Sequence, residues 1–432
     1  MKIACISDLH LNKSVYKNVK DKEFPNLPFR NGDFMRAFRY ICDKCLDEIK
    51  PDLLVIGGDI YDHFEPTNEI RGFFSSQIQR FSEEKIPVII LIGNHDVCKK
   101  HHALKDLYEL RLKKMQIIEY PHIIQARGHQ LLFFPYSLDI ERKKVAPRAA
   151  FAKFIRQFEE KNDGNPAILF GHMGVQKARM NEYNDPDSLD NKKDLGEITT
   201  TTTTLAAGRA RKLEYKNMNP HDVNNEDLDE IGVSHAILGD YHEHQVLDTK
   251  QCHAMYTGSI EKTDFSEIGQ QKGFIVYDSE AEEIPKYGKC RFIEYPNCRI
   301  MLELTGTVSN MKQRLKEIDP KDYPNAIIKM AFHGTSTELT DFLAEVESLT
   351  EEIKNLYNPI HLFHTQKLDR SKEEEIATKL EQEIMEKGTM EDQDVIEVVK
   401  ELIDERDGED KKEKKALKEL AQEIYDEVME KS

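Results

Sequence analysis

The sequence predicts a layered α/β fold over residues 1 to about 285. Three observations predict it: short apolar runs recur along this region, helical patterns lie between them, and turn residues flank each run. Buried strands that alternate with helices give this pattern. The predicted strands are residues 3–6, 53–56, 88–92, 131–134, 168–170 and 236–238.

The predicted helices and further domains follow from the same periodicities. Apolar residues repeat every three or four positions over 34–49 and 70–81, as on one face of a helix. A second, small α/β domain is expected over 291–370. Its predicted strands are 300–304, 326–332 and 360–363, and its predicted helices are 311–318 and 339–356.

Two segments leave alternatives open. Residues 181–225 interrupt the pattern with an insertion that carries a threonine run at 199–204, which suits either a polar loop or a strand. Residues 371–432 are charged and helical, with two apolar stripes. These helices either pack on their own domain or present an amphipathic face to a partner protein.

Composition restricts the class of protein. No apolar stretch among the 432 residues approaches the roughly 20 residues that a membrane-spanning helix needs. We therefore expect a cytoplasmic protein, either associated with the nucleoid or, if the protein is viral, in the cytoplasm of the host. Seven scattered cysteines do not suggest a disulfide framework. A net charge of −18 argues against non-specific DNA binding by the whole surface, although basic residues can still cluster locally.

Five polar motifs follow the predicted strands. Ligand sites in α/β sheets lie beyond the carboxyl ends of strands, and divalent cations prefer carboxylate, amide and imidazole ligands. One such motif is weak evidence, but five in series predict a two-metal site that activates water to attack phosphorus. The motifs are Asp8-Leu9-His10, Gly58-Asp59, Gly93-Asn94-His95-Asp96, Gly171-His172 and Gly239-Asp240-Tyr241-His242.

This motif series resembles the calcineurin-like metallophosphoesterase superfamily and, more narrowly, the SbcD-type DNA repair nucleases. The resemblance implies a two-sheet sandwich flanked by helices, a small α/β capping domain, and a C-terminal helical tail that binds an SMC-like ABC ATPase. Further matching segments are Gly57 to Asp62 with Pro66, Tyr256-Thr257-Gly258-Ser259, Glu261, Glu267 and Lys272-Gly273-Phe274.

The resemblance also implies roles for the motif residues. One divalent ion would be held by Asp8, His10, Asp59 and His242. The other would be held by Asp59, Asn94, His172 and Asp240. His95 matches the catalytic histidine, which stabilises the phosphate or protonates the leaving oxygen and is not a ligand. Asp96 is expected to orient His95 or to support its loop.

Two departures from the family pattern bear on the metal. Many members have histidine where this chain has Asp240, so three carboxylates, Asp8, Asp59 and Asp240, would offset most of the charge of two ions. This favours Mn²⁺, with Mg²⁺ as the alternative, over zinc. Some relatives have histidine where this chain has Asp62, with His63 next to it.

The expected function is a metal-dependent DNA nuclease, an exonuclease on duplex ends and a single-strand endonuclease. Alternatives are a stand-alone phosphatase or cyclic nucleotide phosphodiesterase, and a non-catalytic repair scaffold. A homodimer is expected from the resemblance, with 70–81 and 104–110 as possible faces. Basic residues near the site motifs favour DNA as the substrate, although each cluster taken alone is also typical of an ordinary solvated surface. These basic residues are Lys99-Lys100-His101-His102, Lys177, Arg179, Arg209, Arg211 and Lys212.

Overall fold

The computed structural model divides into two compact units, Met1–Arg299 and Ile300–Ser432. Most of the insertion predicted at 181–225 and nearly all of the tail predicted at 371–432 lie outside the described residues. The structure describes residues 1–13, 15–98, 101–110, 112, 114–136, 145–162, 164–175, 178, 223–334, 336–368, 415 and 418.

The first unit contains two six-stranded mixed sheets. The strands of one sheet are β1 Lys2–Ile6, β2 Leu53–Ile56, β3 Val88–Leu91, β4 Met115–Ile118, β11 Gly273–Asp278 and β12 Cys290–Glu294, in the order β12-β11-β1-β2-β3-β4. Those of the other are β5 His122–Ala126, β6 His129–Phe134, β7 Ala167–His172, β8 His235–Gly239, β9 Gln245–Val246 and β10 His253–Tyr256, in the order β5-β6-β7-β8-β10-β9.

The strands at the centre of each sheet are buried on both faces. On β1, Ile3 and Cys5 join a core between the two sheets, whereas Ala4 and Ile6 join the core beneath the helices. Successive side chains of a strand point to opposite faces, so a strand between two apolar layers needs an unbroken apolar run. This is why the central strands were recognisable as short apolar segments.

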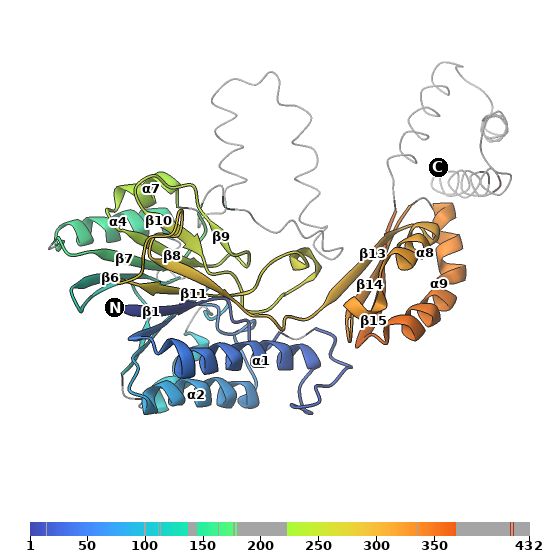
Figure 1. The fold of residues 1–432 in the computed structure, drawn as a ribbon, viewed down its shortest axis with the longest axis horizontal. Helices are drawn as coiled ribbons and strands as arrows, with labels where there is room; N and C mark the ends of the chain where they lie inside the picture. The colour runs from blue at the N-terminus through green and yellow to red at the C-terminus, as the bar shows by residue number, and fades with distance from the viewer. Residues whose placement is uncertain are drawn as a thin grey trace, which may run out of the picture. The chain divides into compact units, whose positions relative to one another are not determined.

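Helices cover the outer face of each sheet (Figure 1). α1 Phe29–Lys44, continued by the π-helical turn η1 Cys45–Ile49, and α2 Asn68–Glu83 pack on the first sheet. Phe38 of α1 stacks on Phe74 of α2 with ring centroids 5.5 Å apart. α4 Pro147–Glu159 and α7 Asn225–Glu230 pack on the second sheet.

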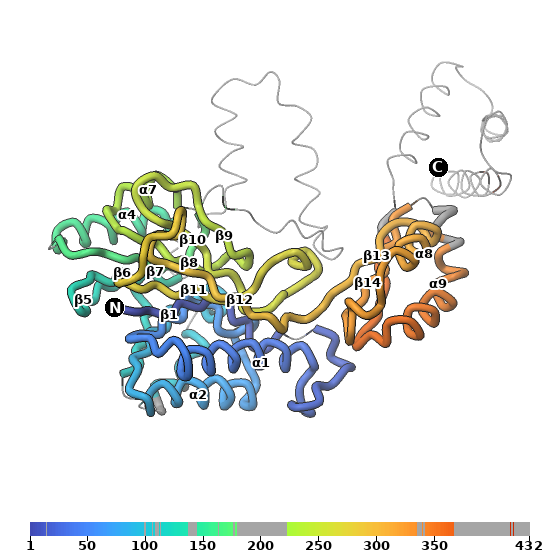
Figure 2. Tube along the Cα trace, viewed as in Figure 1, coloured from blue at the N-terminus to red at the C-terminus, as the bar shows by residue number. Residues whose placement is uncertain are grey.

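The predicted α/β class is confirmed, and each of the six predicted strands is present. Figure 2 follows the chain as it returns beside β1, where β11 pairs antiparallel with β1 and β12 pairs antiparallel with β11. The sequence reading missed these two strands together with β4, β5, β9 and β10. The outermost strand β5 has only exposed and half-buried positions and therefore lacks the buried apolar run that marks a central strand.

The second unit has a three-stranded parallel sheet in the order β13-β14-β15. Its elements match the β-α-β-α-β pattern read from the sequence. They are β13 Met301–Gly306, α8 Val308–Glu317, β14 Ile327–Gly334, α9 Ser336–Tyr357 and β15 His361–Leu368. Among the described residues of both units, no helix combines the length and apolar character needed to cross a membrane.

Candidate metal centre

The five polar motifs lie at or just beyond strand ends in the first unit, with Gly171-His172 as the last two residues of β7. β1, β2 and β3 run parallel in one sheet, and β7 and β8 run parallel in the other, so the motifs collect at the carboxyl ends of both sets. The two sheets meet at the centre, where Nε2 of His172, the last residue of β7, lies 3.4 Å from Oδ1 of Asp59 after β2.

The backbone around these motifs is unusual. Asp8, His10, Asp59 and Asp240 all have positive φ, a conformation that costs a non-glycine residue about 1–3 kcal/mol. Gly58 has φ +104°, and a Cβ there would lie 2.4 Å from His172 Nδ1. The tight turns therefore bring polar side chains together at a cost in backbone strain.

One cluster of potential ligands contains Asp8, His10 and His242, whose donor atoms lie within 4.8 Å of one another. His10 Nε2 faces His242 Nε2 at 2.9 Å. His242 Nδ1 donates to Glu267 Oε1 at 2.8 Å, which leaves a lone pair on Nε2 of the neutral ring. His10 Nδ1 similarly lies 3.3 Å from Asp62 Oδ1. Two facing lone pairs repel each other unless a cation or proton lies between them.

The second cluster surrounds His172. Its Nδ1 donates to the carbonyl of Gly57 at 2.8 Å, so Nε2 of the neutral ring also carries a lone pair. This Nε2 lies 2.8 Å from Asn94 Oδ1, 3.4 Å from Asp59 Oδ1 and 3.8 Å from Asp240 Oδ1. Four electron-pair donors of the types that bind divalent metals thus converge on one point.

Asp59 lies between the two clusters. Its Oδ1 faces His172, and its Oδ2 lies 3.9 Å from His10 Nε2. The side chain is almost fully buried. The two carboxylate oxygens of Asp59 therefore face different clusters.

The pKa values within this centre shift in both directions, because burial lowers the pKa of His10 whereas the pKa values of His172 and Asp240 rise. Burial alone would lower the pKa of His172, but the carboxylates of Asp59, Asp240 and Asp8 raise it to about 10. Burial, with nearby Asp59 and Asp8, raises the pKa of Asp240 to about 6. The carboxylates around His172 thus stabilise positive charge at its imidazole. The residues therefore fit a divalent metal centre.

His95 is more exposed than the other donor groups of the centre, and with His10 and Asp59 it forms a third group whose donor atoms lie within 4.8 Å of one another. Its side chain is 42% exposed, and its Nδ1 donates to the carbonyl of Asp62 at 2.8 Å. Its Nε2 lies 4.0 Å from Asp59 Oδ2. The ring therefore stands at the edge of the centre with Nε2 toward it, where a bound phosphate ester would be in reach.

Asp96 supports the surrounding loops. Its carboxylate accepts hydrogen bonds from the backbone N–H groups of Ile60, Tyr61 and Gly93, so it joins the loop after β2 to the loop after β3. Burial and the neighbouring Asp59 raise the pKa of Asp96 to about 7. Of the two roles expected for Asp96, these contacts match loop support.

A buried ion pair holds His242, and the motif reading did not assign this role. Lys272 Nζ lies 2.6 Å from Glu267 Oε2 and donates to the carbonyl of His242 at 2.9 Å. Glu267 Oε1 binds the imidazole of the same histidine, and both members of the pair are buried. Glu267 and Lys272 appeared only as family-matching residues in the sequence, because their contact depends on the path of the loop between them.

Asp62 has a comparable position beside His10. Burial alone would raise its pKa, but the hydrogen bond to His10 and the charge of Lys13 lower it overall. Lys13 Nζ lies 3.0 Å from Asp62 Oδ1. His101 and His102 are described and line a nearby cavity. The other basic residues proposed near the site motifs lie outside the described residues: Lys99, Lys100, Lys177, Arg179, Arg209, Arg211 and Lys212.

The family model of the calcineurin-like phosphoesterases matches residues 1–200, which contain the first four of the five motifs. The chain carries a calcineurin-like phosphoesterase domain. Phosphoesterases of this family use divalent metals, and the convergent donor groups of the first unit agree with that chemistry.

Curated relatives of this phosphoesterase include nuclease subunits and a DNA repair protein. The D subunit of the nuclease SbcCD from Staphylococcus epidermidis is 23% identical over 299 residues, 66% of this chain and 67% of that protein. The D subunit from Staphylococcus saprophyticus is 23% identical over 389 residues, which cover 80% of this chain and 93% of that protein. The DNA double-strand break repair protein Mre11 of Archaeoglobus fulgidus is 32% identical over 111 residues, 25% and 23% of the two chains.

Proposed function

We propose that this phosphoesterase is a metal-dependent DNA nuclease that processes DNA ends in a repair complex. The observation that carries the proposal is the pair of lone-pair clusters that share Asp59. Similarity to nuclease subunits over as much as 80% of the chain supports DNA as the substrate. We expect exonuclease action on duplex ends and endonuclease action on single strands.

The ligand assignment extends the geometry of the two clusters. Asp8, His10, Asp59 and His242 would hold one divalent ion. Asp59, Asn94, His172 and Asp240 would hold the other. Two such ions supply an activated water molecule and neutralise charge on the phosphate. Three carboxylates among these groups favour Mn²⁺, or Mg²⁺, over zinc.

His95 would act on the substrate itself. Its Nδ1–H is fixed by the Asp62 carbonyl, so Nε2 is held toward the centre. From there it can donate a hydrogen bond to a phosphate oxygen or a proton to the leaving oxygen, provided that it enters the reaction protonated. General acid catalysis of this kind contributes about 10²–10⁴-fold to rate.

The test compares cleavage of linear duplex DNA, single-stranded DNA and a small chromogenic ester, with Mn²⁺ and with chelator. We expect Mn²⁺-dependent cleavage of both DNAs, and His95→Ala should reduce kcat by about 10²–10⁴-fold while calorimetric Mn²⁺ binding is retained. Hydrolysis of the ester without DNA cleavage would indicate a phosphatase. No metal-dependent hydrolysis would indicate a scaffold.

We also propose an SMC-like ABC ATPase as the partner, bound through residues 371–432, and a homodimer for which 70–81 and 104–110 are candidate faces. The ATPase partner is supported by the name of the relatives, which are subunits of a complex, and by the apolar stripes in the tail sequence, whereas the homodimer follows from the family resemblance alone. Removal of 371–432 should abolish co-purification with the ATPase while Mn²⁺ binding persists. Association that survives the deletion would place the interface elsewhere.

A further inference from the structure

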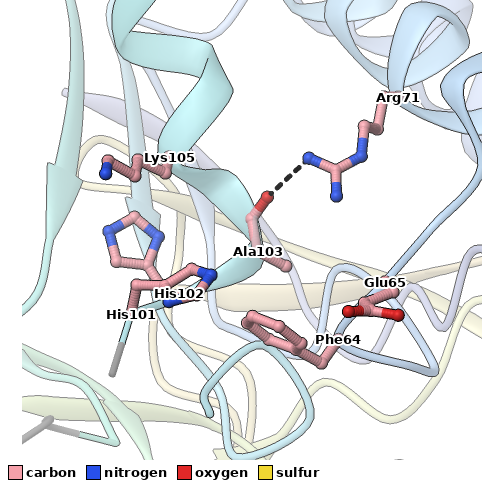
Figure 3. Close-up of a pocket in the computed structure, with 7 residues that line it drawn as sticks. All are labelled: Phe64, Glu65, Arg71, His101, His102, Ala103 and Lys105. Atoms are coloured by element: carbon pink, nitrogen blue, oxygen red, sulfur yellow. Dashed lines mark hydrogen bonds between the residues drawn. The ribbon is translucent and has the colours of Figure 1, made fainter. Parts of the chain in front are cut away.

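A cavity of about 370 Å³ lies beside the metal centre. One wall is the loop that follows Asp62, and the other is the segment that follows the loop of His95 and Asp96. Figure 3 shows Arg71 reaching from α2 toward the carbonyl of Ala103, with the two histidines and Lys105 on the opposite side. The lining residues are Phe64, Glu65, Arg71, His101, His102, Ala103 and Lys105.

Both walls are fixed to residues of the metal centre. The carbonyl of Asp62, two residues before Phe64, accepts the hydrogen bond from His95 Nδ1. The carbonyl of Asp96 accepts a hydrogen bond from the backbone N–H of Ala103 at 2.7 Å. The cavity therefore keeps a set position relative to His95 and Asp96.

Arg71 joins the two walls. Its Nε donates to the carbonyl of Pro66 at 3.1 Å, and its Nη1 donates to the carbonyl of Ala103 at 3.4 Å. The guanidinium thus braces the cavity and places a permanent positive charge in its lining. Lys105 is the second cationic side chain of the lining, Glu65 is its acidic member, and His102 lies 3.4 Å from Glu119.

The lining also offers aromatic surface. Phe64 and His101 lie edge to face with ring centroids 4.9 Å apart, and Phe64 is half-buried. Nucleic-acid bases stack on such side chains, and cations beside them hold the phosphates. A volume of about 370 Å³ is near the lower limit for small-molecule sites, which suits a single nucleotide and not an oligonucleotide.

We propose that this cavity binds one nucleotide of the substrate strand, adjacent to the nucleotide whose phosphate is cleaved. Phe64 and His101 contact the base, and Arg71 and Lys105 attract the backbone. The inference rests on the proposed nuclease function and specifies how the strand is held. Because the walls are tied to His95, occupancy of the cavity sets which linkage reaches the metals.

The test maps cleavage along an end-labelled single strand that contains one abasic site. The full-length protein should show reduced cutting, by about 10-fold, at one fixed offset from the missing base, where the cavity would be left without a base. Phe64→Leu should remove this reduction, so that cleavage is equal along the strand. Phe24→Leu, a matched change at a half-buried phenylalanine outside the cavity, should retain the reduction.

A second measurement separates strand binding from chemistry. Lys105→Gln should raise KM for the single strand several-fold and leave hydrolysis of bis(p-nitrophenyl) phosphate unchanged, whereas exposed Lys153→Gln on α4 should alter neither. An even cleavage pattern in the wild-type protein, or a reduction that persists in Phe64→Leu, would overturn the cavity assignment. Ester hydrolysis with no cutting of any strand would instead overturn the nuclease function, and with it this inference.

Discussion

At the scale of the residue, the site depends on side chains that orient the potential ligands. Glu267 binds the imidazole of His242, and Lys272 binds both Glu267 and the His242 carbonyl. Asp62 plays a similar part at His10. Groups of this kind fix the tautomer and ring orientation of metal-binding histidines, so their removal weakens metal binding without removing a ligand.

Glu267→Gln should therefore lower Mn²⁺ affinity by about 10–100-fold, measured by calorimetry on metal-free protein. It should also destabilise the fold by about 3–5 kcal/mol because buried Lys272 loses its partner. The double variant Glu267→Gln/Lys272→Met should regain stability while affinity stays low. Glu261→Gln, at another buried acid, should bind Mn²⁺ normally. Wild-type affinity in Glu267→Gln would show that the contact is only structural.

The residues of the two clusters were predictable because each belongs to a short motif near the end of a strand that the sequence identifies. The supporting contacts were not, because they depend on loop conformation. Glu267 reaches His242 from 25 positions along the chain, and Asp62 reaches His10 from the loop after β2. No periodicity encodes either approach. Positive φ at Asp8, His10, Asp59 and Asp240 was equally hidden, since these residues do not reveal their backbone conformation as glycine does.

At the scale of the element, sequence identified the strands that are buried on both faces. β2 and β3 are short, wholly apolar runs, and their parallel pairing with β1 follows from helical crossovers. β12 mixes buried with exposed positions at the end of its sheet and gives no such signal. β11 does carry an apolar run. Its antiparallel pairing with β1, however, joins residues near the two ends of the first unit, and local sequence does not indicate such a distant pairing.

β8 carries a pH-sensitive contact remote from the metal centre. Burial, with nearby His253 and Lys289, lowers the pKa of His235 to about 4, and its Nε2 accepts the backbone N–H of Lys289 at 3.0 Å. The folded protein thus keeps this ring neutral, while the unfolded chain protonates it below about pH 6.5. The stability it contributes is full above pH 6.5 and is lost as pH falls toward 4.

Between pH 7.5 and 5.0 this histidine should account for a loss of about 2 kcal/mol in the free energy of unfolding, measured with urea. His235→Gln keeps an acceptor for the Lys289 N–H and does not titrate. The free energy of unfolding of this variant should therefore fall by about 2 kcal/mol less than that of the wild-type protein over the same pH range. His122→Gln, at an exposed position of β5, should show the same pH dependence of the free energy of unfolding as the wild-type protein. Equal pH dependence in all three proteins would contradict the assignment.

At the scale of the whole molecule, the two units contribute different things to the proposed function. The first unit contains both potential metal clusters, the cavity beside them and the match to the phosphoesterase family. The second unit has its own apolar core between a parallel sheet and two helices. With a net charge of −18, the proposed DNA binding would depend on local basic groups and on the metal ions. The affinity for DNA should therefore fall less steeply with rising salt concentration than the affinity of a basic protein does.

The most direct test of the account is anomalous diffraction from crystals soaked in Mn²⁺. We predict two manganese peaks about 3.5–4 Å apart, bridged by Asp59, one contacted by His10 and His242 and the other by His172. A single peak, or peaks without Asp59 between them, would contradict the two-metal centre on which the proposed chemistry depends.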